Sequence, residues 1–311
     1  MGEMLKSLFS LAISFFVISF VSFALLHYSQ GSVAFAFSPQ AISPSLRAKI
    51  ESNLDLDKPL VIQYGNWLMR VIKGDLSLSL ISGESVSAIL KERLPYTLIL
   101  GGSAFVLLIV LSIIFALLCL VNPFLDRCIT FLGIGFSALP TFSLALLLIL
   151  FLSAKWTLFP SSGVSEIGAE DDLIDRLRHL VLPVSALVIS HLGFFTQFVR
   201  STLSESLNHG FISFGLARGL SPIFIYRTWV LKYSLSPIIA YFASSFVSFL
   251  ASTYVVEGVF GYGGIGETLI SSLIFKDYPV VLAVLVLSFL AVVIVDCVAK
   301  YMCAVLNRGR V

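Results

Sequence analysis

Six stretches of this chain run for 18 residues or more without an Asp, Glu, Lys or Arg, and they constrain its fold more than any other feature. At 1.5 Å per residue, about 20 apolar residues span a ~30 Å hydrocarbon core as one helix. The runs lack the period-two alternation of barrel strands, and a backbone in lipid must satisfy its own hydrogen bonds. We therefore predict an all-α membrane protein with six transmembrane helices, over Ser7–Leu26, Leu98–Val121, Cys128–Ala154, Leu180–Val199, Tyr233–Val256 and Tyr278–Val295.

The composition agrees with a protein that lies in lipid. Only 12% of the 311 residues are charged and 58% are hydrophobic, whereas a soluble domain carries about 25% charged residues. The net charge of +2 gives no sign of a nucleic-acid partner. All four cysteines lie in apolar runs or at their edges, which predicts apolar packing and no disulfide framework.

The first apolar run has a competing interpretation as a cleaved signal peptide. Ala34-Phe35-Ala36 has the small-x-small form of a cleavage site. However, the apolar region of a signal peptide is typically about 7 to 15 residues long, and Ser7–Leu26 is longer. We predict an uncleaved first transmembrane helix over residues 1–27.

The longest polar segment, residues 28–95, follows this first run. It contains two helical patterns, Ser45–Asn53 and Gln63–Ile72, and Trp67 and Met69 are the expected packing residues of the second. We expect a sizeable loop with short helices, and not an independent globular domain.

The distribution of charge predicts the orientation. With the N-terminus in the cytosol, the cytosolic segments hold nine Lys and Arg against four Asp and Glu, as the positive-inside rule requires. Both termini are then cytosolic, and residues 28–95 face outward. A five-helix core follows over residues 96–305, with a cytosolic loop at 200–236 and a cytosolic tail at 306–311.

The cytosolic loop contains a pattern for a short helix. Leu207, Phe211, Phe214 and Arg218 repeat at the helical spacing of three or four residues, and Gly219 precedes Ser221-Pro222 as a stop signal. Gly215, Ala217 and Gly219 add little side-chain bulk. The spacing leaves two interpretations open: a surface helix that joins two spans, or a helix that docks into a groove on a partner.

A second informative segment contains five glycines between Gly258 and Gly266, which predict an irregular turn. It lacks the strand–loop–helix context and the Gly-Lys-Ser/Thr ending of a phosphate-binding loop. No Walker-type loop occurs elsewhere in the sequence, so we expect this chain to bind no cofactor. If ATP drives the protein, another subunit binds it.

Titratable side chains are few within the runs and at their ends. Asp296 and Lys300 stand four residues apart and are expected to pair on one helix face. His191 lies in the middle of the fourth run, where it either lines a pathway or hydrogen-bonds a neighbouring helix. The sequence shows no nucleophile–base set and no metal-ligand cluster, so neither catalytic residues nor a metal site is expected.

Several short motifs follow one another along the whole chain. They are Leu56-Asp-Lys-Pro-Leu60, Gly74-Asp-Leu-Ser-Leu-Ser79, Glu92-Arg-Leu-Pro-Tyr-Thr97, Phe159-Pro-Ser-Ser-Gly163, Leu177-Arg-His-Leu-Val-Leu-Pro183, Ala217-Arg-Gly-Leu220, Val256-Glu-Gly-Val-Phe260, Gly264-Ile-Gly266 and Asp277-Tyr-Pro279. Each motif alone is weak, but their order and spacing together are specific. In this respect the chain resembles the inner-membrane permeases of the dipeptide, oligopeptide and nickel branch of the ABC importers.

The resemblance implies a type I ABC importer permease in a bacterial inner membrane. It implies a cytosolic coupling helix that docks on an ATPase, with Phe211, Phe214, Gly215, Ala217, Arg218 and Gly219 as the docking residues. It also implies an outer gate or a contact with a solute-binding protein, formed by Glu257, Phe260, Gly264, Gly266, Asp277, Tyr278 and Pro279. The implied partners are a second related permease in a heterodimer, two ATP-binding subunits that use ATP and Mg²⁺, and an extracytoplasmic solute-binding protein.

The solute implied most directly by the resemblance is a di- or oligopeptide, with nickel or another small solute as the alternative. The chain departs from the family pattern at Gly215, where alanine is usual, at Ser213 and Leu216, where basic residues are usual, and at Gly263, where proline is usual. A self-energised transporter or channel is the alternative of a different class, and it would use His191 and Asp296 as a proton path. The absence of repeated halves in the sequence argues against it, and a membrane enzyme is a more distant alternative.

Overall fold

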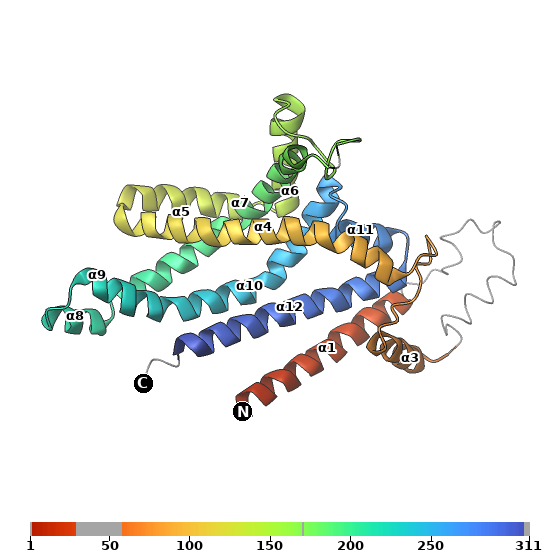
Figure 1. Cartoon of the computed structure of the whole chain (residues 1–311), viewed down its shortest axis with the longest axis horizontal. Coiled ribbons are helices and arrows are strands. Elements are labelled where there is room, and N and C mark those ends of the chain that lie inside the picture. The colour runs from red at the N-terminus through yellow and green to blue at the C-terminus, as the bar shows by residue number, and fades with distance from the viewer. Residues whose placement is uncertain (1, 29–57, 170, 308–311) are drawn as a thin grey trace, which may run out of the picture. The chain divides into compact units, whose positions relative to one another are not determined.

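The computed structural model describes residues 2–28, 58–169 and 171–307 (Figure 1). Within these ranges the chain is helical, and its only β pairing is a single bridge between Leu78 and Ser85. The elements are α1 (Gly2–Tyr28), α3 (Leu60–Ile72), α4 (Val86–Val121), α5 (Pro123–Ser137), α6 (Thr141–Leu148), the π-helix η2 (Ile149–Lys155), α7 (Leu173–Leu207), α8 (Gly210–Ala217), α9 (Pro222–Ile225), the π-helix η3 (Tyr226–Val230), α10 (Leu231–Phe260), α11 (Ile265–Ile274) and α12 (Tyr278–Asn307). The expected helix at 45–53 and the small-x-small motif at 34–36 lie outside the described residues.

Four of the described helical stretches are long and apolar enough to cross a membrane: α4, α7, Pro222–Phe260 and α12. A fifth crossing is possible if α5 and α6–η2 together form one span. The described apolar part of α1 is the shorter stretch Ile13–Leu26. The structure therefore contains a multi-helix membrane fold, while the count of six spans and the orientation of the termini stay predictions.

The third apolar run differs from the sequence-based expectation. Instead of one helix over Cys128–Ala154, α5 and α6–η2 meet at a bend of 100° between Ser137 and Thr141. Pro140 stands at this break and immediately precedes α6. Because proline lacks an N–H and excludes helical backbone from the residue before it, one helix ends here and the next begins.

The chain divides into two compact units, and each is described by itself. The first comprises residues 1–94 and 268–291. In it the α1 residue Ser19 shares a hydrogen bond of 2.8 Å with the Tyr64 hydroxyl of α3, and Phe23 packs against Trp67. Trp67 is buried as expected, but Met69 is 57% exposed and does not pack in this unit.

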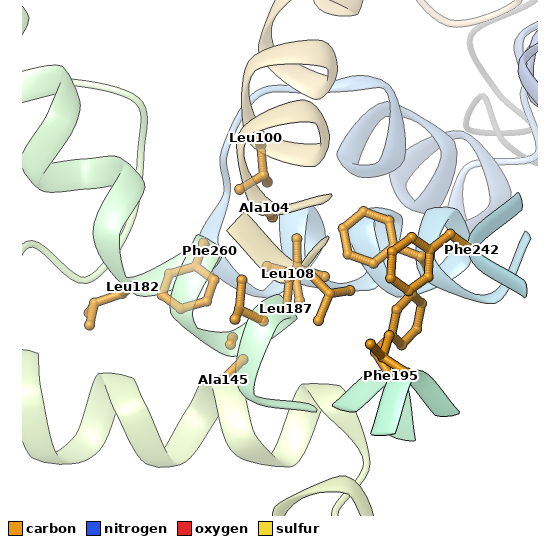
Figure 2. Close-up of a cluster of buried hydrophobic side chains, with 14 of the residues drawn as sticks. Leu100, Ala104, Leu108, Ala145, Leu182, Leu187, Phe195, Phe242 and Phe260 are labelled. Carbon is orange, nitrogen blue, oxygen red and sulfur yellow. The ribbon is translucent and has the colours of Figure 1, made fainter. Parts of the chain in front are cut away.

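The second unit comprises residues 95–267 and 292–311 and contains a continuous apolar core (Figure 2). Leu100, Ala104 and Leu108 stand four residues apart, so they follow one face of α4. They meet buried side chains from α6, α7 and α10, namely Ala145, Leu182, Leu187, Phe195, Phe242 and Phe260. The core thereby fixes the helices on which the candidate sites are built.

The crossing of α5 and α7 is unusually close. A Cβ atom placed on Gly133 would lie 2.9 Å from the Cα atom of Gly193, which is nearer than side chains approach. Small residues allow two helix backbones to come together in a membrane, where packing rather than hydrophobicity holds helices together. The crossing is secured further by an ion pair of 2.5 Å between Arg200 of α7 and Asp126 of α5.

Candidate functional site

A helical hairpin follows α7 and consists of α8, α9 and η3, residues 210–230 (Figure 1). The predicted short helix is confirmed, and it ends as expected at Gly219, whose φ is +80°. The Gly219 N–H donates to the Leu216 carbonyl over 2.9 Å and the Leu220 N–H donates to the Gly215 carbonyl over 3.1 Å. This is a Schellman motif. The inclusion of Leu207 in the helix was wrong, because Leu207 ends α7.

One side of α8 packs inside the hairpin. A Cβ atom on Gly215 would lie 2.7 Å from the Trp229 ring and 2.9 Å from Ile225 Cδ1, so glycine lets α8 approach α9 and η3. The Phe211 ring lies 4.8 Å from the His209 ring and 5.6 Å from the Tyr233 ring. Gly215 and Phe211 therefore pack inside the hairpin.

The other side of the hairpin is exposed and largely apolar. Phe214 is 53% exposed, Leu216 48% and Ile223 69%. The Arg218 guanidinium lies 4.4 Å from the centre of the Phe214 ring, a cation–π arrangement one helical turn apart. We name this surface the docking face, and it consists of Phe214, Leu216, Ala217, Arg218, Ile223 and Phe224.

The structure thus divides the six residues predicted for docking. Phe214, Ala217, Arg218 and Gly219 are exposed, whereas Gly215 is buried and Phe211 half-buried. The sequence missed Ile223 and Phe224, whose exposure depends on how α9 folds back. Exposed apolar surface of this kind marks a site of interaction with another protein or with the membrane.

Substitution of Gly215 by tryptophan is expected to displace α9 and η3, because the new side chain would occupy the place of Trp229. We expect the variant to bind ATPase subunits less well through loss of hairpin structure, and its hairpin to become more sensitive to proteolysis. Limited proteolysis in detergent measures this. Gly210→Trp is the matched control, since no atom lies within 4 Å of a Cβ there; equal cleavage of both variants would contradict the packing assigned to Gly215.

A buried hydrogen bond closes the base of the hairpin. The Ser234 hydroxyl of α10 donates to the Ser206 hydroxyl of α7 over 2.7 Å, and both side chains are at most 1% exposed. The Ser206 hydroxyl in turn donates to the Thr202 carbonyl. The hairpin is therefore joined to both α7 and α10 and does not hang from a flexible linker.

The Gly-rich segment forms a compact corner between α10 and α11, residues 257–267, which we name the corner. The carboxyl group of Glu257 is fully buried, and its Oε2 accepts the N–H of Gly266 over 2.6 Å. The Thr97 hydroxyl of α4 accepts the N–H of Ile265 over 2.8 Å, and it also faces the Glu257 carboxyl group together with the N–H of Glu267. These contacts satisfy N–H groups that the first turn of a helix leaves free.

Each of three positions in the corner requires glycine for a different physical reason. Gly261 adopts the left-handed conformation, with φ of +55°, and ends α10. A Cβ on Gly264 would overlap the Glu257 carboxyl group, and one on Gly266 would lie 2.7 Å from Tyr254 Cβ. The expected irregular turn is present, but it is shorter than predicted, because α10 continues through Phe260 and α11 begins at Ile265.

Tyr262 completes the interior of the corner and is 2% exposed. Burial raises the pKa of the Tyr262 phenol to about 12. The phenol therefore stays neutral throughout the physiological range.

A second buried carboxylate lies in the first unit. Asp277 precedes α12 and is 2% exposed. It accepts a hydrogen bond from the Ser79 hydroxyl and another, of 3.1 Å, from the Leu80 N–H. Ser79 also accepts the N–H groups of Ile81 and Ser82, so Asp277 anchors the turn that precedes α4.

The residues predicted for an outer gate or partner contact are therefore mostly interior. Glu257, Phe260, Gly264, Gly266, Asp277 and Tyr278 are buried, and Pro279 is half-buried. The first four belong to the second unit and the last three to the first unit. Their contacts within each unit are those of side chains that position backbone, and their partners Thr97 and Ser79 were missed because each is distant in sequence.

The polar side chains considered for a proton path have local partners. Lys300 Nζ lies 2.6 Å from Asp296 Oδ2, which confirms the predicted pair. His191 lies against the Ser190 hydroxyl and the Leu187 carbonyl of its own helix, and its Nε2 is 3.5 Å from the Ser252 hydroxyl of α10. In the described part of the chain no group of three or more His, Cys, Asp or Glu is placed to hold a metal ion, and the four cysteines are free.

The fold is that of an ABC transporter membrane subunit. A chain from "Crystal structure of an amino acid ABC transporter with histidines" superimposes with a TM-score of 0.56 at 14% identity, over 70% of this chain and 94% of that chain. A chain from inward-facing structures of the MetNI methionine ABC transporter gives a TM-score of 0.55 at 18% identity, over 71% of this chain and 97% of that chain. At these identities the similarity shows the fold alone.

Sequence comparison identifies the family. The model of the "Binding-protein-dependent transport system inner membrane component" matches residues 108–303, and the model of the N-terminal part of such membrane components matches residues 2–101. The chain therefore belongs to the binding-protein-dependent transport system inner membrane components, the permeases of ABC importers. It is an inner-membrane protein and a transport component, not a catalytic subunit.

Relatives match nearly the whole chain. The oligopeptide transport system permease protein AppB of Bacillus subtilis (strain 168) is 30% identical over 293 residues, which cover 93% of each chain. A putative peptide transport system permease protein of Brucella abortus (strain 2308) is 28% identical over 281 residues, 89% of each chain. A probable peptide ABC transporter permease protein of Sinorhizobium fredii is 28% identical, over 85% of each chain.

Proposed function

We propose that this chain is one of two related permease subunits that together import di- or oligopeptides. The observation that carries the proposal is the 30% identity to an oligopeptide permease over 93% of both chains. A solute-binding protein outside the membrane would deliver the peptide, and two ATP-binding subunits inside would supply the energy.

The docking face supports an ATPase contact on the cytosolic side. Exposed apolar side chains with one cation stacked on an aromatic ring suit an apolar pocket with an acidic rim. Leu216 stands in this face where the family pattern usually has a base, so the matching pocket is expected to be more apolar than in typical relatives. ATP and Mg²⁺ would be bound by the docked subunits and not by this chain.

α10 supplies a direct mechanical route from the docking face into the membrane. It follows η3 without a break and runs for 30 residues, about 45 Å at 1.5 Å per residue. Moving a two-state equilibrium from 1:99 to 99:1 needs about 5.5 kcal/mol of differential binding. The hairpin must therefore stay firmly folded in both states, which the inward packing of Gly215 and the Ser206–Ser234 hydrogen bond favour.

Reconstitution tests the transport proposal. Liposomes that contain this chain, its partner permease and both ATPases are expected to accumulate a labelled tripeptide only with ATP and the solute-binding protein present. Unlabelled di- and tripeptides should compete, and Ni²⁺ should not. Competition by Ni²⁺ alone would point to metal import instead.

The same preparation tests the energy source. Liposomes that contain this chain alone are expected to accumulate no solute, because the chain has no nucleotide-binding loop. Sustained uphill uptake by the chain alone, driven by a pH gradient, would contradict the proposal and favour a self-energised transporter.

A further inference from the structure

We propose that Glu257 is a positioning residue that couples the movement of α10 to α11. The proposal rests on the function proposed above. It assigns to Glu257 a role inside the chain, in place of the direct contact with a solute-binding protein that the sequence suggested.

The burial of Glu257 is the first reason. Its side chain is fully buried in a strongly apolar unit, although a carboxyl group is costly to remove from water. Ionisable side chains within membrane helices are rare and mark function by default. A partner protein cannot touch a side chain with no exposed surface, so its function must be exerted on its immediate neighbours.

The neighbours of Glu257 belong to the first turn of α11. Oε2 accepts the Gly266 N–H over 2.6 Å, and the Glu267 N–H faces the same carboxyl group. A carboxyl group at the N-terminus of a helix is favoured by the helix dipole as well as by the free N–H groups. Thr97 holds the adjacent Ile265 N–H from α4. The first turn of α11 is therefore held by hydrogen bonds to side chains of α4 and α10, in addition to the peptide segment that links it to α10.

The place of Glu257 on α10 is the second reason. The helix begins directly after the hairpin and ends at Phe260, one turn beyond Glu257. A displacement of the hairpin is therefore carried along α10 to the corner. The Glu257 carboxyl group packs directly against Gly264, with no space even for a methyl group between them. A movement of α10 therefore displaces the start of α11 as well.

The test uses Glu257→Gln, which preserves shape, in the assembled complex with both ATPases, the partner permease and the solute-binding protein. We expect tripeptide uptake to fall roughly tenfold, because the amide that replaces the carboxyl group has one oxygen fewer to accept N–H groups and adds buried N–H donors without partners. ATP hydrolysis should continue, so more ATP is consumed per peptide. Retention of the ATPases and the half-saturating concentration of solute-binding protein should be unchanged.

A second variant and a control separate the roles. Gly264→Ala keeps the glutamate at position 257, but the added methyl group displaces its carboxyl group from the first turn of α11. We therefore expect the same loss of coupling. Ile274→Ala changes an exposed side chain at the end of α11 and should transport normally. Wild-type coupling in both Glu257→Gln and Gly264→Ala would overturn the proposal, as would a raised half-saturating concentration of solute-binding protein with an unchanged maximal rate.

A solute-independent measurement keeps this test separate from the peptide assignment. In a protein without its four native cysteines, Ser271→Cys places an exposed thiol on α11. We expect its rate of maleimide labelling to change when ATP and vanadate trap the complex, and this change to be lost with Glu257→Gln. If wild-type complexes import no peptide but show this Glu257-dependent change in labelling, the proposed solute is wrong and the proposed coupling stands. If labelling changes equally with and without Glu257→Gln, the proposed coupling is wrong.

Discussion

Replacing Phe214 by alanine is expected to weaken binding of the ATPase subunits by roughly 30-fold or more, because truncation of an aromatic anchor at the centre of an interface costs about 2 kcal/mol or more. Phe214 is 53% exposed in the described chain and carries the Arg218 guanidinium on its ring. The substitution therefore removes both an apolar anchor and the support that orients a cation. Titration of purified ATPase into permease-containing nanodiscs measures the dissociation constant.

Two controls make this prediction specific. Phe124 at the start of α5 is also an exposed phenylalanine, at 71%, but lies outside the hairpin, so Phe124→Ala should bind the ATPases normally. Because Phe214 is on the exposed side of α8, whereas Gly215 is buried against Trp229, Phe214→Ala should show wild-type resistance to proteolysis, unlike Gly215→Trp. Wild-type affinity of Phe214→Ala, or an equal loss with Phe124→Ala, would remove the ATPase contact from the docking face.

The short helix of the hairpin could be predicted from sequence, but not the side on which each residue lies. The spacing of Phe211, Phe214 and Arg218 identified a helix, and Gly219 identified its end. Which face becomes interior depends on where α9 returns, and that is decided by the fit of Trp229 and Ile225 against Gly215. This contact joins residues whose individual patterns give no sign of pairing.

The corner shows the same limit over a longer distance. The glycines between Gly258 and Gly266 predicted an irregular turn because they permit conformations closed to other residues. The role of Glu257 as a hydrogen-bond acceptor for the first turn of α11 could not be predicted, because it depends on where the start of α11 lies relative to the end of α10. The Thr97 contact spans 168 residues of sequence, and a periodic pattern carries no information at that range.

The apolar runs predicted membrane helices because insertion depends on composition, which is a local property. They did not predict the bend of 100° in the third run, although Pro140 marked its position. A proline indicates where a helix is interrupted, whereas the angle between the two resulting helices depends on what each of them packs against. For α5 that packing is the close approach to α7 at Gly133 and Gly193.

This crossing gives the prediction with the largest expected effect on stability. Replacing Gly193 by leucine should destabilise the protein by about 3 kcal/mol or more, the upper end of the usual cost of overpacking. Even a Cβ atom there would overlap the Gly133 carbonyl and lie 2.7 Å from Ser137 Oγ. Backbone cannot yield as a flexible side chain does, so α5 and α7 must separate. Fluorescence-detected size exclusion with a thermal ramp measures the loss of folded protein.

Gly135 provides the matched comparison, because it lies on α5 two residues from Gly133, is exposed, and has no atom within 4 Å of a Cβ. Leucine there adds an apolar side chain to an outward-facing surface and improves helix propensity by up to about 1 kcal/mol. Gly135→Leu should therefore melt at or slightly above the wild-type temperature. If Gly193→Leu melts within about 2 °C of Gly135→Leu, a change worth only about 1 kcal/mol in a protein of this size, then backbone contact does not hold α5 against α7. The ion pair between Arg200 and Asp126 would then have to carry the crossing, and Arg200→Ala in the Gly193→Leu background would release it.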